Sequence, residues 1–104
     1  MQNQSMQKIL QDFCLQNKPI PEEKIRRTIS LTQIKEIYSD WESNDMGESF
    51  YLYTGTQSES SQKFYFLVWH LRTWNGGWSS EDDFFWHLIT EENFNEFYEM
   101  SLGS

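Results

Sequence analysis

The first apolar positions of the chain recur with a helical period. They are spaced three and four residues apart: Met6, Ile9, Leu10, Phe13 and Cys14. Such spacing places the side chains on one side of a helix. The prolines at 19 and 21 end the pattern, because the residue before a proline disfavours helical backbone. We therefore predict an amphipathic helix over residues 4–16.

Two patterns compete in residues 22–31. Pro21-Glu22-Glu23 is typical of a helix start, whereas Arg27–Leu31 alternates like a short strand. We favour a helical segment that begins at Pro21, and a short strand over Arg27–Leu31 remains the alternative. Helical spacing then returns in a set that has Ser30 or Thr32 as a candidate N-cap: Ile34, Ile37, Tyr38 and Trp41. A further helix is predicted over this set.

After the polar loop Ser43–Gly47 the pattern changes to strands and then to a final helix. Three segments rich in aromatic or β-branched residues are predicted as strands: Ser49–Gly55, Lys63–Trp74 and Asp83–Thr90. Thr90 is the expected cap of the last helix, in which four residues share a face: Phe94, Phe97, Tyr98 and Leu102. The predicted fold is α+β, with N-terminal helices, a three-stranded antiparallel meander and a C-terminal helix.

The connection before the third strand raises a question of register. Asn75-Gly76 favours a two-residue hairpin turn. That turn would place Asp82 and Asp83 opposite interior positions of the preceding strand. A loop over about residues 75–82 is predicted instead. The residues that this loop leaves exposed at the sheet edge are Trp74, Trp78, Glu81, Asp82 and Asp83.

The central strand carries apolar residues on both faces. Tyr65, Leu67 and Trp69 point one way, whereas Phe66 and Val68 point the other way. One interpretation is that helices cover both faces. The other is that a small domain has too few helices, so that apolar surface is left for a partner or a second copy.

Composition and charge restrict the kinds of partner that the protein is expected to bind. The 104 residues fit one domain, and 17% of them are aromatic, which is enough ring surface for a core. The formal net charge is −8: residues 1–35 hold six basic and three acidic residues, and residues 36–104 hold two basic and thirteen acidic residues. Such a field repels nucleic acid and anionic lipid and attracts basic proteins. Neither nucleic-acid binding nor membrane binding is expected.

The sequence offers few candidate residues for catalysis or metal binding. Cys14 lies on the apolar stripe of the first helix and has no second cysteine, so a buried structural thiol is expected. His70 and His87 each lie in a Trp-His-Leu triplet, and neither has metal-ligand spacing. The sequence holds no nucleophile elbow and no phosphate-binding glycine loop. We expect no enzyme activity, no metal and no cofactor.

The N-terminus lacks a signal-like apolar run, and no stretch approaches the ~20 apolar residues of a membrane span. A cytoplasmic location is therefore expected. The closing Gly103-Ser104 also matches a cloning remnant and carries no weight.

The carboxylates are the most informative group. Glu92, Glu96 and Glu99 form an i, i+4, i+7 stripe on the last helix, and Glu36 and Asp40 repeat the i, i+4 relation on the predicted middle helix. Like charges at this spacing cost roughly 0.2–0.5 kcal/mol per pair. The carboxylates either only keep the protein soluble or create a negative electrostatic field that attracts a basic protein.

In the second interpretation Trp74 and Trp78 are hot-spot anchors. The acidic residues assigned to the same partner surface are Glu81, Asp82, Asp83, Glu92, Glu96, Glu99, Asp45 and Glu48.

The chain as a whole resembles the small immunity proteins of bacterial toxin–immunity systems, including those of contact-dependent inhibition. The resemblance is one of type: about a hundred residues, strongly acidic, rich in aromatics, with one cysteine and no catalytic motif. It implies an inhibitor that occludes the active site of a basic toxin domain, often a nuclease. It carries over no residue roles.

Three alternatives stay open beside the immunity protein. The main one is a self-associating structural or adaptor module, a homodimer that uses a spare apolar sheet face. The others are a phage-type inhibitor of a host defence protein, which only gene context separates from an immunity protein, and a small carbohydrate-binding protein.

Overall fold

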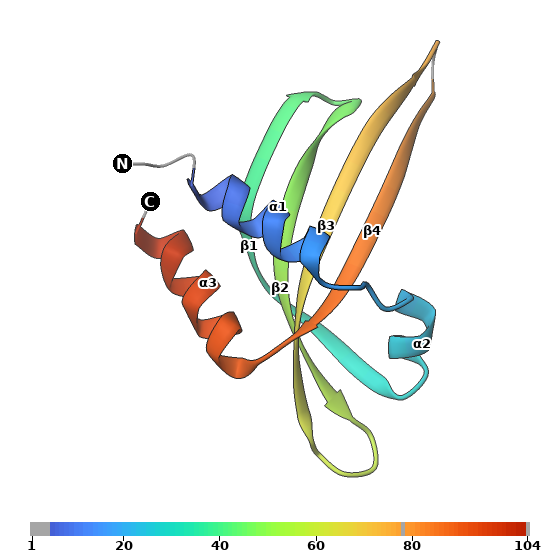
Figure 1. Cartoon of the computed structure of the whole chain (residues 1–104). Helices are drawn as coiled ribbons and strands as arrows, with labels where there is room; N and C mark the ends of the chain where they lie inside the picture. Colours follow the sequence, from blue (N-terminus) through green and yellow to red (C-terminus); the bar gives the residue numbers. More distant parts are fainter. Residues whose placement is uncertain (1–4, 78, 104) are drawn as a thin grey trace.

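The computed structural model describes residues 5–77 and 79–103. Its elements are α1 (Ser5–Gln16), α2 (Glu22–Arg26), β1 (Ile29–Ser43), β2 (Met46–Gln57), β3 (Lys63–Gly76), β4 (Ser79–Ile89) and α3 (Glu91–Gly103). The strands form one four-stranded antiparallel sheet in the order β1-β2-β3-β4 (Figure 1). The α+β class is confirmed, whereas the prediction of three strands is wrong.

The additional strand is β1, which occupies the segment predicted to be the middle helix. Its pairing with β2 shifts register between Gln33 and Lys35, between Glu36 and Tyr38, and between Trp41 and Ser43. Each β-bulge adds one residue to the strand, so the alternation of period two is interrupted. Apolar residues then fall three and four positions apart, which imitates a helix.

The residues of that imitated helical face do not share a face in the sheet. Ile37 is buried, and Tyr38 packs against the same core, whereas Ile34 is exposed at a bulge. The i, i+4 pair Glu36 and Asp40 is likewise not a helical pair. The repulsion expected between these two carboxylates on a helix is therefore absent.

The other element predictions fare better. The first helix is confirmed as α1, and all three predicted strands are present as β2, β3 and β4. Residues 22–31 contain both competing structures: α2 is helical, and β1 then begins at Ile29. Two residues differ from the prediction: Ile9 and Leu102 were expected on the apolar faces of their helices, but they are 44% and 62% exposed.

The predicted loop over residues 75–82 is wrong. β3 continues to Gly76 and β4 begins at Ser79, so Asp82 pairs with Arg72 and Asp83 pairs with Leu71. The connection uses Gly76 and Gly77, whose positive φ angles of 97° and 61° favour glycine. Gly76 pairs with Ser79, and the register shifts between Trp74 and Gly76. Asp82 and Asp83 therefore do not lie opposite the interior positions that argued against a hairpin.

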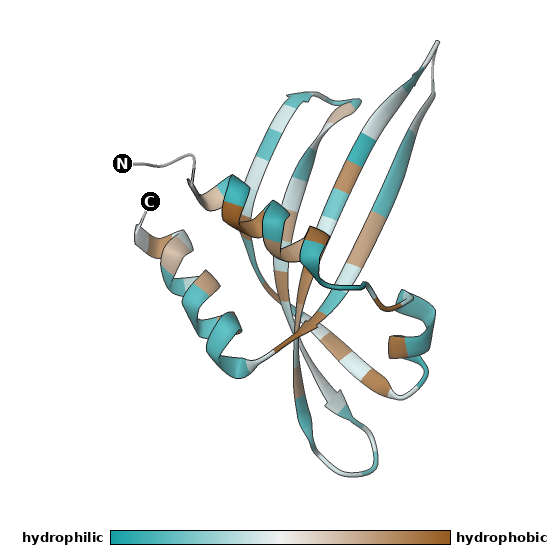
Figure 2. Ribbon diagram, in the orientation of Figure 1, coloured by the Kyte–Doolittle hydropathy of each residue, from teal (hydrophilic) through white to brown (hydrophobic). Residues whose placement is uncertain are grey.

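Two of the helices cover one face of the sheet, which we call the α1/α3 face. Its buried cluster joins residues of both helices and of all four strands: Leu10, Cys14, Ile37, Phe50, Leu52, Leu67, Ile89, Phe94 and Phe97. Figure 2 shows that apolar and polar positions are interspersed along both helices. The predicted cap of α3 is confirmed, since Thr90 Oγ1 accepts a hydrogen bond from the Asn93 N–H at 3.0 Å.

The opposite face, which we call the α2 face, is covered over a smaller area. Its buried cluster contains Ile25, Phe66, Val68 and Trp86. The helix α2 has only five residues, so it covers one end of the sheet. The segment before it is held to the outer edge of β4, where the Ile20 N–H donates to the Trp86 carbonyl at 2.8 Å.

Candidate functional site: the hairpin ends

The β1–β2 and β3–β4 hairpins project past the helices at one end of the sheet (Figure 1). We call residues 39–48 and 70–83, apart from Trp78, the hairpin ends. Most of the predicted partner-binding residues lie here. Trp78 lies outside the described residues.

On the α1/α3 face of the hairpin ends, acidic residues line up across the sheet. The strand registers place Asp40, Glu48, Leu71 and Asp83 side by side in one row that crosses all four strands. Because cross-strand partners project from the same face, Asp40 and Asp83 lie on one surface. Glu81 follows in the next row of that face, opposite Thr73.

The exposed carboxylates of this surface have few cations near them. After residue 36 the sequence contains only Lys63 and Arg72 as basic residues. Lys63 begins β3 at the far end of the sheet, and Arg72 is engaged by Asp82. On α1, Lys8 pairs with Asp12 at 3.4 Å. The surface is therefore strongly negative.

A groove of about 320 Å³ runs along this surface beside α1. Its acidic walls include Asp40 and Glu42, and its apolar part includes Met46, Trp69 and Leu71. Arg72 also borders the groove. We call Asp40, Glu42, Glu81 and Asp83, with the groove beside them, the acidic face.

Glu48 has a different position from the other predicted partner-binding residues. Only 7% of it is exposed, and its carboxylate accepts hydrogen bonds from Gln7 Nε2, from Gln11 Nε2 at 2.8 and 3.0 Å, and from Trp69 Nε1 at 2.9 Å. A buried carboxylate is tolerated when donors surround it. Glu48 thus fastens α1 to the sheet. The sequence signal was the i, i+4 spacing of the two glutamines.

Asp82 lies on the α2 face, opposite to its neighbours Glu81 and Asp83. Arg72 Nε and Nη2 donate to its carboxylate at 2.6 and 3.2 Å, and His70 Nε2 lies 2.8 Å from Oδ1. Hydrogen bonds from Arg72, and then from His70, lower the pKa of Asp82 to about 2. Arg72 Nη1 also donates to the Asn44 carbonyl at 2.9 Å, which ties the two hairpins together.

Aromatic rings enclose His70 in the same network. The His70 ring stacks on Phe84 with centroids 4.3 Å apart and lies 5.5 Å from the Trp41 ring. Trp41 Nε1 donates to Ser49 Oγ at 2.8 Å, and Ser49 donates to Glu36 at 3.2 Å. The α2 face of the hairpin ends therefore carries a network of hydrogen bonds and ring contacts, which no local pattern of the sequence predicts.

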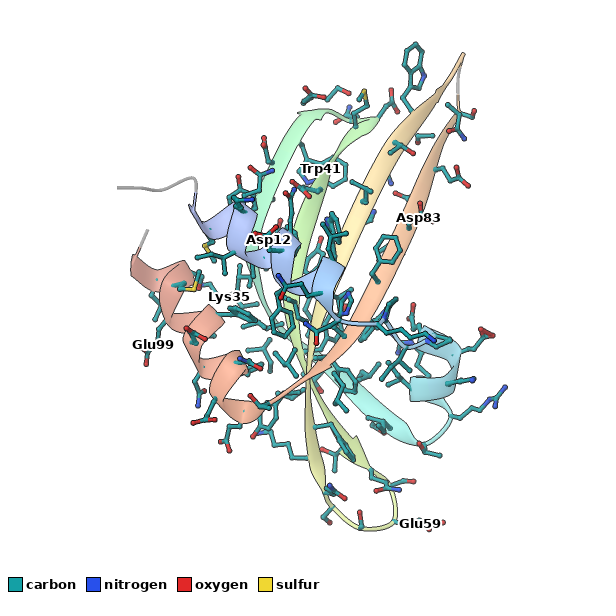
Figure 3. All side chains as sticks on the ribbon, in the orientation of Figure 1. Asp12, Lys35, Trp41, Glu59, Asp83 and Glu99 are labelled. Carbon is teal, nitrogen blue, oxygen red and sulfur yellow. The ribbon has the colours of Figure 1, made fainter. Side chains whose placement is uncertain are left out.

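The remaining predicted site residues are dispersed. Trp74 is 53% exposed, lies on the α2 face with Arg72, and donates its indole N–H to the Gly77 carbonyl at 3.2 Å. Asp45 is exposed in the β1–β2 turn. The stripe Glu92, Glu96 and Glu99 is exposed on α3. Figure 3 shows Glu99 and Asp83 on opposite sides of the molecule, so this stripe is separate from the acidic face.

Residues 5–77 and 79–103 hold no group of three or more His, Cys, Asp or Glu arranged to bind a metal ion. Cys14 is buried, as expected, and burial together with the charge of Glu48 raises its pKa to about 12. A thiol with that pKa stays protonated at neutral pH and is a poor nucleophile.

No family model, curated protein or solved structure matches this chain. Within the described residues, no helix combines the length and the apolar character that crossing a bilayer requires.

Proposed function

We propose that the protein is a non-enzymatic inhibitor that binds a basic protein through the acidic face, as an immunity protein binds the toxin domain it neutralises. The observation that carries the proposal is a set of exposed carboxylates gathered on one sheet face: Asp40, Glu42, Glu81 and Asp83. Complementary charge of this kind speeds encounter and selects the partner.

The shape of the hairpin ends suits occlusion. They project from the helix-covered body, so they can enter a cleft (Figure 1). In a nuclease, the cations that hold substrate phosphates would meet these carboxylates instead. Met46, 39% exposed, and the half-buried Leu71 supply apolar contacts beside them. The proposed setting is the bacterial cytoplasm.

The proposed surface differs from the one that the sequence suggested. Glu48 is buried and hydrogen-bonded, and Asp82 is exposed but paired with Arg72, so both are assigned to the structure of the protein. Asp40 and Glu42 take their place, because they share a face with Glu81 and Asp83.

The test compares two charge variants of the whole chain. The first, D40N/E42Q/E81Q/D83N, removes the acidic face and changes the net charge from −8 to −4. The second, E92Q/E96Q/E99Q, removes the α3 stripe and changes it from −8 to −5. Each variant and the unaltered protein are used as bait in lysate of the source organism, with elution by rising salt and identification by mass spectrometry.

The expected result is one basic protein that binds the unaltered chain and the α3 variant, that elutes at high salt, and that the acidic-face variant loses. The unaltered chain must also inhibit the activity of that protein. Equal capture by both variants would assign binding to overall charge and overturn the proposed site. Capture without inhibition would overturn the inhibitor.

One observation favours self-association as a second candidate. Phe84 and Leu88 are 52% and 50% exposed on β4, an edge strand, and both project from the α2 face. Two copies could bury these side chains against each other. Sedimentation equilibrium at low and high salt tests this, with Leu88→Ser as the variant. A dimer that is insensitive to salt and lost in the variant supports the module.

A further inference from the structure

The groove of the acidic face combines apolar surface with exposed carboxylates. Met46 is 39% exposed, and Trp69 and Leu71 are half-buried, so each contributes apolar surface to the groove that solvent can reach. Asp40 and Glu42 line the same groove and are exposed. Its volume of about 320 Å³ lies at the lower end of the range for small-ligand sites, about 300–1,000 Å³. The groove therefore suits a small group, such as one side chain of a partner.

The two exposed carboxylates of the groove have no cation of their own. Asp40 and Glu42 belong to none of the ion pairs among the described residues. Arg72 also borders the groove, but its guanidinium donates to the Asp82 carboxylate and to the Asn44 carbonyl. Its charge is therefore shared with Asp82, and Asp40 and Glu42 remain free to bind a cation from outside.

A third carboxylate adds negative charge to the base of the groove. Glu48 lines the groove although only 7% of it is exposed, and its oxygens accept four hydrogen bonds from the neutral side chains of Gln7, Gln11 and Trp69. It belongs to none of the ion pairs among the described residues. The field of a buried charge is screened less than that of an exposed one. Glu48 therefore attracts a cation to the groove through space, without a direct hydrogen bond.

We propose that this groove receives one lysine or arginine side chain of the basic partner, with its aliphatic stem on Met46 and Leu71 and its charged end beside Asp40 and Glu42. Long basic side chains bury their methylene groups along apolar surface and keep the charged end near water. An apolar side chain would leave the carboxylates without a cation, and an acidic one would be repelled. The inference rests on the proposed function, because it names the group by which the partner is recognised.

The test uses two probes that share a five-carbon stem and differ in charge: n-pentylammonium and 1-pentanol. Methionine methyl groups labelled with ¹³C are followed by NMR during titration of the unaltered chain. We expect pentylammonium to shift the Met46 methyl signal until the groove is saturated. Pentanol should bind about fivefold more weakly, which is the contribution of exposed ion pairs. Met100 follows Glu96 by one turn of α3, so its signal reports any binding to acidic surface without this groove.

Two variants of equal charge separate the groove from general acidity. D40N/E42Q and E92Q/E96Q each change the net charge from −8 to −6. The first should bind both probes equally, and the second should keep the preference for pentylammonium. Equal affinity of the two probes for the unaltered chain, or equal shifts of Met46 and Met100, would overturn the groove. Because the probes are compared on the unaltered chain, the test stands even if a variant fails to fold.

The experiment needs no partner, so the groove and the inhibitor function can fail separately. If pentylammonium binds as expected while the lysate yields no basic protein, the groove is supported and the inhibitor function is lost. If the acidic-face variant loses a captured inhibitor target while pentylammonium leaves Met46 unshifted, the inhibitor function is supported and the groove is overturned.

Discussion

The two faces of the hairpin ends differ in how they hold charge, although the same strand supplies both. Glu81 and Asp83 project from the α1/α3 face and are exposed. Asp82, between them, projects from the α2 face, where Arg72 donates hydrogen bonds to its carboxylate and His70 Nε2 lies 2.8 Å from Oδ1. Side chains of a strand alternate between faces. Three consecutive exposed carboxylates are thus divided into two that belong to none of the ion pairs among the described residues and one that is paired with Arg72.

The two faces of the sheet also differ in the size of the buried cluster that each one carries. The cluster under α1 and α3 draws on both helices and all four strands, whereas the cluster under α2 contains four buried residues. A groove of about 190 Å³ opens beside the smaller cluster and reaches Phe66. Because its cluster is larger, we predict that the α1/α3 face carries most of the packing energy.

The largest effect is expected from phenylalanine truncation in the core. Phe50 and Phe66 are 0% and 1% exposed, on neighbouring strands and opposite faces. Phe50 is stacked on Trp69 at 5.6 Å within the closed cluster, and Phe66 borders the groove. Phe→Ala in a core costs about 3–5 kcal/mol, and more where the site cannot collapse. Urea unfolding should place Phe50→Ala near the top of that range and Phe66→Ala near the bottom. The reverse order would contradict the comparison.

The next effect concerns Glu48. Its replacement by alanine leaves three donors without their acceptor, and an unsatisfied buried group costs about 1–3 kcal/mol. Glu48→Ala should therefore lower the free energy of unfolding by about 2–3 kcal/mol. The conservative Glu48→Gln keeps one acceptor oxygen and should cost about half as much. If both variants are as stable as the unaltered chain, the hydrogen bonds of Glu48 do not stabilise the packing of α1 on the sheet.

A smaller effect should appear when the pH is lowered. The pKa of Asp82 falls from its ordinary value of 3.8 to about 2 in the folded chain. A depressed pKa in the folded state stabilises the protein above the unfolded value, and this contribution is lost as pH falls through the folded value. Unfolding measured at pH 6, 4 and 2 should show that the stability difference between the unaltered chain and Asp82→Asn shrinks between pH 4 and pH 2. A constant difference would indicate that the network of Asp82 does not depend on its charge.

The smallest effect is expected on the acidic face. Glu81 and Asp83 are exposed and belong to none of the ion pairs found in the described residues. Their replacement in E81Q/D83N should leave the free energy of unfolding within about 0.5 kcal/mol of the unaltered value. The same substitutions should weaken capture of the basic partner. A marked loss of stability would mean that these carboxylates have structural partners, as Asp82 does.

Much of the fold could be predicted from local patterns. β3 could be predicted because the twelve residues Lys63–Trp74 contain no glycine or proline and are rich in aromatic rings. Thr90 could be predicted because its position before an apolar helix face matches a cap. β1 was missed because its bulges arise from pairing with β2, which no local pattern reveals. The helical spacing of its apolar residues is a product of those bulges.

The site was predicted in part. Sequence reasoning identified Glu81 and Asp83 as exposed, and both are. It grouped them with Asp82 and Trp74 because it assumed a loop, in which neighbours share an environment. Once the segment is a strand, alternation separates them. Asp40 was assigned to a helix, so its place beside Asp83 depended on long-range register.

The bulges of β1 also bear on how the chain avoids aggregation. β1 lies at an edge of the sheet, and a long regular edge strand is a template for the strand of another molecule. Its fifteen residues are broken by register shifts into short regular runs, none of which offers a neighbouring chain a continuous ladder. At the other edge, Ile20 occupies the pairing position beside Trp86, and the charges of Glu81 and Asp83 lie along the remainder. Both edges of this aromatic-rich sheet are thus protected against pairing with a strand of another molecule. The hairpin ends can therefore be exposed without promoting aggregation.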